Sequence, residues 1–181
     1  MDALQPWLVE TLRSARPVAH LMRSHWAWPV CETLHFFGLS LLIGAIGAFD
    51  LRLMGIGRNI PIAALHRVIP WGIAGFLLNV GTGLMFLMTE PDQYIYNPSF
   101  HFKILFMAAA GLNVLAFYSV VFWKIRVLPP GVSTPLSAKA VGAISLSMWI
   151  GVIIAGRLLT FYRPGVCLTQ ALSFPFYCVP Q

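Results

Sequence analysis

Residues 27–54 read AWPVCETLHFFGLSLLIGAIGAFDLRLM, and this stretch decides the fold. About 20 apolar residues are enough for a helix to cross the hydrocarbon core of a bilayer, and this run is longer. Trp26 and Trp28 suit the headgroup boundary, and Pro29 suits the first turn of a helix. We therefore expect a membrane-spanning helix here, although it carries two polar side chains, Glu32 and His35, near its start.

Three further runs have the same character, at residues 62–88, 100–123 and 138–162. Of the 181 residues, 58% are hydrophobic and 10% are charged, whereas soluble domains carry about 25% charged residues. The links between the runs are short, so neighbouring helices must be antiparallel. The sequence predicts an all-α membrane protein, with an up-down bundle of four transmembrane helices within residues 27–162.

Two segments flank this bundle. In residues 1–26, Leu4, Leu8, Leu12 and Ala15 share one helical face and Pro17 interrupts the pattern, which predicts an amphipathic helix at the membrane interface. No apolar core of a cleavable signal peptide is present there. Residues 163–181 form a tail rich in proline and aromatic residues, which we expect to lie outside the cytoplasm.

The positive charges indicate a topology. The net charge of +6 comes from Lys and Arg residues scattered singly at the ends of apolar runs, which is typical of membrane anchoring and not of nucleic-acid binding. The links after the first and third runs are basic and the link after the second is not, so both termini are expected outside. Four arginines count against this orientation: Arg13, Arg16, Arg23 and Arg163. Cys167 and Cys178 favour it, because disulfides persist outside the cytoplasm. We expect them to form a disulfide, with two free thiols as the alternative.

Two histidines are predicted at one membrane level. At 1.5 Å per residue, His35 lies about 9 Å and His101 about 4.5 Å inside the outer face. A b-type haem takes two such axial imidazoles from different helices. Gly38, one turn below His35, would leave room for the porphyrin, and Lys103 and Arg157 would neutralise its propionates.

Other interpretations of these side chains remain open. His35 could be a hydrogen-bonded packing residue, or His20, His25, His35 and Glu32 could bind copper or zinc. Glu32 is expected to form an ion pair with Arg157, since an intramembrane charge normally pairs or faces a wet cavity. It could instead orient an axial histidine, or pass protons to a quinone headgroup.

Three stretches carry a resemblance to a family. They are ETLHFFGLSLLIGAIGAFDLRLMG (32–55), PWGIAGFLLNVGTGLMFL (70–87) and NPSFHFKILFMAAAGLNVLAFY (97–118). The chain resembles a family of small four-helix proteins of the bacterial inner membrane that has no assigned activity. In layout it is similar to b-type membrane cytochromes and to CopD-type copper-resistance proteins. The resemblance implies a multi-pass protein of the cytoplasmic membrane, and haem or copper as its cofactor.

Three functions follow as hypotheses. The first is a haem-b electron-transfer protein between a redox partner on the outer face and the quinone pool. The second is a non-catalytic accessory or anchor subunit of a larger membrane complex, with the N-terminal segment and the tail as contact surfaces. The third is copper or zinc handling at the outer face. No Ser-His-Asp or Cys-His set shares one level, so hydrolysis is not expected, and whether the protein is an enzyme stays open.

Overall fold

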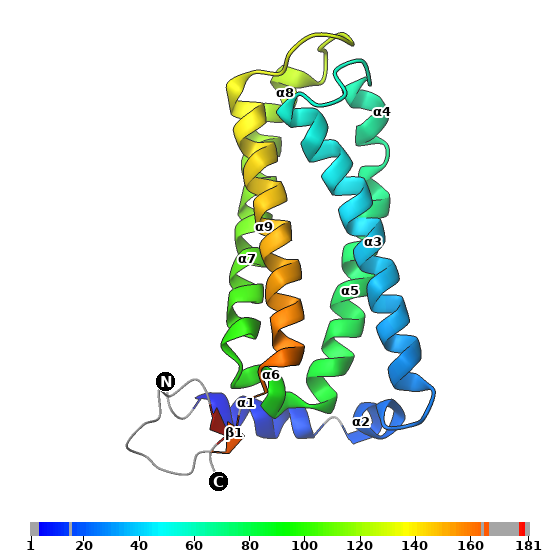
Figure 1. The fold of residues 1–181 in the computed structure, drawn as a ribbon, viewed down its shortest axis with the longest axis vertical. Helices are drawn as coiled ribbons and strands as arrows, with labels where there is room; N and C mark the ends of the chain where they lie inside the picture. The colour runs from blue at the N-terminus through cyan, green and yellow to red at the C-terminus, as the bar shows by residue number, and fades with distance from the viewer. Residues whose placement is uncertain (1–3, 15, 164, 167–177, 180–181) are drawn as a thin grey trace.

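The predicted bundle is confirmed. A computed structural model of the chain describes residues 4–14, 16–163, 165–166 and 178–179. Four helical segments run up and down side by side (Figure 1). They are built on α3 (Ala27–Met54), α5 (Ile69–Thr89), α7 (Pro98–Ala116) and α9 (Leu136–Phe161). By length and composition all four can cross a membrane, and their ends agree with the predicted spans to within two residues. A multi-pass membrane protein is therefore indicated.

Two of the four segments are interrupted. The second begins as α4 (Ile62–His66), breaks at Arg67 and Val68, and continues as α5 with Pro70 in its first turn. This break is the interruption that Pro70 predicts, because proline cannot donate the backbone hydrogen bond of a helix interior. The third passes from α7 through a π-helical turn, η1 (Phe117–Val121), into α8 (Phe122–Ile125).

Glycines set the closest helix contacts. Gly38 of α3 faces Gly75 of α5, where a Cβ on Gly75 would lie 2.5 Å from the carbonyl oxygen of Gly38. Gly142 of α9 lies against α3, where a Cβ would be 2.8 Å from the backbone oxygen of Asp50. Without side chains at these points, the backbones approach closely and pack, as membrane helices do.

Not every small residue of the helices lies at a close contact. Close packing occurs at Gly72 and Gly75 of α5. Gly44 and Gly111 have no described neighbour within 4 Å of a built Cβ. Gly151 of α9 lies against the ring of Phe106 in α7. Small size permits a contact, but the rotation of the helix decides whether it forms.

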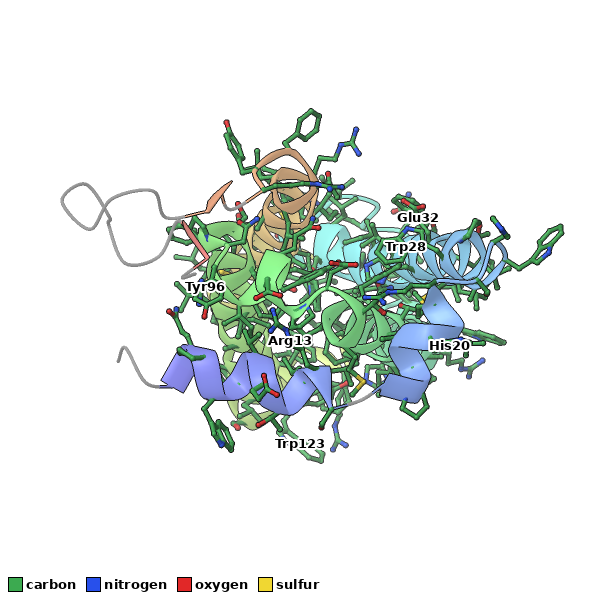
Figure 2. All side chains as sticks on the ribbon, turned by 90° about the horizontal axis from the view of Figure 1, so that it is seen from below. Arg13, His20, Trp28, Glu32, Tyr96 and Trp123 are labelled. Carbon is green, nitrogen blue, oxygen red and sulfur yellow. The ribbon has the colours of Figure 1, made fainter. Side chains whose placement is uncertain are left out.

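Two short helices lie across one end of the bundle, which we call the α1–α2 end (Figures 1 and 2). They are α1 (Leu4–Arg13) and α2 (Arg16–Met22), and the short α6 (Pro91–Ile95) lies at the same end. The expected interfacial helix is thus divided between Arg13 and Arg16. Pro17 lies in the first turn of α2, as Pro70 does in α5, and cannot donate a backbone hydrogen bond to the preceding turn, so the break agrees with the interruption expected at Pro17.

The inner face of α1 packs on the bundle. Val9 is buried with Ile95 and Tyr96 of the α6 region. Arg13 Nη2 donates to Asp92 Oδ2 over 2.9 Å. The N-terminal segment therefore docks onto the protein in addition to any contact it makes with the membrane surface.

The opposite end, which we call the α4–α8 end, is fastened by buried Arg52. Its Nε donates to Ile60 O over 2.8 Å and its Nη2 to Arg58 O over 3.1 Å. Thr134 Oγ1 adds a bond to Leu53 O over 2.7 Å. Arg52 thus binds carbonyls of the loop after α3, and no ion pair with the nearby Asp50 is found among the described residues.

Large apolar side chains cover the outside of the four segments. Examples that are more than half exposed are Trp71, Leu77, Leu105, Leu112 and Leu115. In a membrane these side chains would contact lipid. The direction in which the chain crosses the membrane stays a prediction.

The tail contributes a short parallel pair of strands, β1 (Gly165–Val166) and β2 (Cys178–Val179). The predicted disulfide includes Cys167, which lies outside the described residues, so the pairing stays a prediction. The predicted division of the chain into an N-terminal segment, a transmembrane domain and a tail, with boundaries after residues 26 and 162, also stays a prediction.

Candidate functional site

His35 is held by α5. Its ring is partly buried, and Nδ1 lies 2.8 Å from Thr82 Oγ1. Thr82 Oγ1 also lies 2.7 Å from Leu78 O, a carbonyl that can only accept, so we assign the hydroxyl proton to that bond. His35 Nδ1–H then donates to Thr82, and Nε2 keeps its lone pair. The ring thus presents a hydrogen-bond acceptor on its other side.

The neighbours of His35 fix its orientation further. Cys31, one turn earlier on α3, is buried and directs its thiol at Thr82 O, 3.7 Å away. The ring of Phe86 meets His35 edge-on, with centroids 5.8 Å apart. Gly83 leaves the edge of the ring uncovered, since a Cβ there would come within 3.9 Å of His35 Cε1. His35 is therefore a positioned side chain.

Lys103 approaches from the other half of the bundle. Its side chain lies along Gly156 of α9, where a built Cβ would be 3.7 Å from Nζ. It is partly buried and close enough for its charge to act on His35. Among the described residues it has no hydrogen bond or ion pair. A donor from α7 and an acceptor from α3 thus lie within electrostatic reach of each other, in the half of the bundle near the α1–α2 end.

Tyr94 of α6 lies at the same end of the bundle, where it is partly buried and packs edge-on against Phe100 with centroids 5.7 Å apart. Burial raises the pKa of the Tyr94 phenol to about 12, and the charges of Cys31, Glu90 and Glu32 add to this. Tyr94 is therefore neutral at physiological pH and close to the polar residues at the start of α3.

His101 does not join His35. Its Nδ1 lies 3.0 Å from Asn97 O in the same helix, and its side chain is exposed. At 3.6 residues per turn, two residues along α7 correspond to a rotation of about 200°, so His101 points away from the face that carries Lys103. Its level was predicted correctly, but its direction was not. The expected pair of axial ligands is not formed.

The space expected beside Gly38 is also filled. Gly38 is buried against α5, where a Cβ would lie 2.6 Å from Asn79 Nδ2 and 2.9 Å from Gly75 O. The glycine serves helix packing and leaves no gap for a porphyrin. His35 and His101 are not brought together among the described contacts, and a haem held by this pair stays a prediction.

Glu32 and Arg157 do not form the expected ion pair. Both are exposed, and the ion pair found among the described residues joins Arg13 to Asp92. The Arg157 guanidinium instead lies over the ring of Phe161, 5.0 Å from its centroid. Figure 2 shows Glu32 beside Trp28 at the start of α3.

The histidines of the N-terminal region do not gather into a metal site. His20 lies on α2 and His25 in the turn before α3, and both are exposed. In the described part of the chain, no group of three or more His, Cys, Asp or Glu side chains is placed to hold a metal ion. Copper or zinc handling therefore finds no ligand set among these residues.

Sequence reasoning missed Thr82, the residue that orients His35. It is the seventh residue from the end of α5, and His35 is the eighth after the start of α3, so both lie about 10–12 Å from the same end. Counting residues from the helix end, which placed His35 and His101 at the same depth, would have placed Thr82 at that depth as well.

Comparison with protein-family models, with curated proteins and with solved structures finds no match for this chain, so no family is identified. The structure supports a protein with four long apolar helices.

Proposed function

We propose that this protein binds a lipid-soluble quinone at its α1–α2 end, with the quinone headgroup between His35 and Lys103. One observation carries the proposal. His35 presents an acceptor nitrogen and Lys103 an amino group without a described partner, within electrostatic reach of each other between the two helix pairs. Polar side chains at membrane depth normally pair or line a cavity, and these two are satisfied by a polar ligand.

The chemistry of a quinone fits this donor and acceptor. A quinone carbonyl accepts a hydrogen bond from the Lys103 amino group. A quinol hydroxyl donates to His35 Nε2. The apolar exterior of the bundle lets the isoprenoid tail remain in the lipid. Binding alone is proposed, because the described residues support a polar headgroup contact and do not test electron transfer.

Photolabelling of the full chain in lipid nanodiscs tests the proposal. The probe is a short-chain ubiquinone with an azido group on its ring, and labelled peptides are mapped by mass spectrometry. We expect label on the segments that carry His35, Thr82 and Lys103, and competition by unlabelled short-chain ubiquinone. Decanoate should not compete; competition by it would assign the site to a fatty-acid carboxylate instead.

Matched variants sharpen the result. Loss of a hydrogen bond to a charged donor costs about 1.5–3 kcal/mol, which is roughly 10- to 100-fold in affinity. Lys103→Gln should weaken competition by that factor, whereas Lys124→Gln, which removes an exposed lysine at the α4–α8 end, should not. Label spread evenly over the lipid-facing helices and unchanged in Lys103→Gln would overturn the proposal.

The visible spectrum of the purified protein distinguishes the haem hypothesis from the proposal of a quinone site. A reduced-minus-oxidised band of b-type haem that is lost in His35→Ala, but kept in His20→Ala, would assign His35 to haem and refute the quinone site. The accessory-subunit hypothesis stays a prediction, and stoichiometric co-purification of a partner would test it.

A further inference from the structure

A second polar group lies at the other end of the bundle, separate from the quinone site proposed above. Asp50 of α3 is 3% exposed, and its Oδ2 has no hydrogen-bond partner. Asp50 lies four residues before the end of α3, about 6 Å into the helix from the α4–α8 end. A buried carboxyl oxygen without a partner is rare in native proteins and calls for an explanation.

The elements around Asp50 provide no countercharge. Ser145 of α9 faces the carboxyl, and no charged side chain acts on it. Arg52 lies two residues on, about 200° around the helix, and its guanidinium binds the carbonyls of the 55–61 loop. Lys139 of α9 extends toward Gly55, where a Cβ would lie 3.9 Å from its Cε.

The third neighbouring helix, α7, offers an amide at the same level. Asn113 Nδ2 donates to Val141 O over 3.0 Å, so it already has a partner in α9. Where α9 meets α3, Gly142 packs against the backbone of Asp50 and the side chain of Leu53. Arg52 also keeps a buried nitrogen, Nη1, without a hydrogen-bond partner, but no ion pair between Arg52 and Asp50 is found among the described residues.

A bare carboxylate in this position would carry an uncompensated desolvation penalty. A bound metal cation would need several oxygen ligands, and the surroundings offer one hydroxyl beyond the carboxyl itself. We infer that Asp50 is a proton-binding site, occupied as a neutral carboxylic acid in the core where α3, α7 and α9 meet. The hydrophobic interior then holds no isolated charge.

Isotope-edited infrared spectroscopy of the full chain in nanodiscs tests this inference. The C=O stretch of a protonated carboxyl is distinct from the bands of a carboxylate, and labelling aspartate with ¹³C shifts it. We expect such a band near neutral pH, lost in Asp50→Asn and kept in Asp92→Asn. Because the band is read in the unsubstituted protein, the test does not depend on whether Asp50→Asn folds.

Two results would overturn it. Absence of the band would show that Asp50 is ionised. A band seen in choline chloride but lost in sodium chloride would show that a sodium ion displaces the proton and that the site binds cations. Neither result bears on quinone photolabelling at the other end, so the two proposals fail independently.

Discussion

The close contact between α3 and α5 can be tested by adding a single methyl group to Gly75. In Gly75→Ala the new Cβ would lie 2.5 Å from Gly38 O, 2.8 Å from Leu42 N and 2.9 Å from Leu41 Cβ. Two of these atoms belong to the backbone of α3, so no side-chain rotation relieves the clash. The helices must separate along the contact that joins them.

The magnitude follows from overpacking, which costs about 1–3 kcal/mol in a well-packed core. Replacing glycine by alanine also changes helix propensity, by about 1 kcal/mol. Gly81→Ala in the same helix provides the control, because no described atom lies within 4 Å of its new Cβ. The propensity terms cancel between the two variants. Gly75→Ala should therefore be less stable than Gly81→Ala by about 1–3 kcal/mol.

Unfolding in mixed micelles of mild detergent and increasing sodium dodecyl sulfate, followed by circular dichroism, measures this difference. A shift of the midpoint to lower sodium dodecyl sulfate for Gly75→Ala, with Gly81→Ala at or above the unsubstituted protein, is the expected result. Equal midpoints for the two variants would show that Gly75 does not lie at a close helix contact. That result would refute the packing derived for α3 and α5.

Four further outcomes are expected. Asp92→Asn should lower the free energy of unfolding by at most about 1 kcal/mol, since the ion pair it removes is partly exposed. Val9→Ala removes two buried methyl groups and should lower the free energy of unfolding by about 1.6 kcal/mol in the same assay. An ultraviolet titration of the folded protein should show one phenol, absent in Tyr94→Phe, that ionises only near pH 12. Because folding raises this pKa from 10.0, the stability that it contributes is intact below about pH 10 and is lost between about pH 10 and 12. ¹⁵N NMR should find the His35 proton on Nδ1, and Thr82→Val should abolish that preference; a proton on Nε2 in the unsubstituted protein would contradict the assigned tautomer.

The spans could be predicted because crossing a bilayer requires only length and apolar composition. Residues 27–54 satisfy that requirement without reference to any other part of the chain, and α3 has those limits. Pro70 and the short links likewise act locally. The four helices and their antiparallel order therefore follow from the sequence alone.

For the candidate site, the sequence could predict how deep each side chain lies along its helix, but not which way the side chain points. Counting residues placed His35 and His101 at one level, but which face of α7 points inward depends on the contacts it makes with α9. Packing of Phe106 on Gly151 sets that rotation and directs Lys103 inward instead of His101. The role of Gly38 was misjudged for the same reason, since its neighbour Gly75 belongs to another helix.

The docking of α1 has a consequence for synthesis. Arg13 and its partner Asp92 are 79 residues apart, and Val9 is buried against Ile95 and Tyr96. At about 5–20 residues per second, the ribosome needs roughly 4–16 s to make the intervening chain. During that time α3 and α5 are made, while α1 has no surface of the α6 region to pack against. Although α1 precedes both helices in the chain, it can reach its place only after both of them have been synthesised.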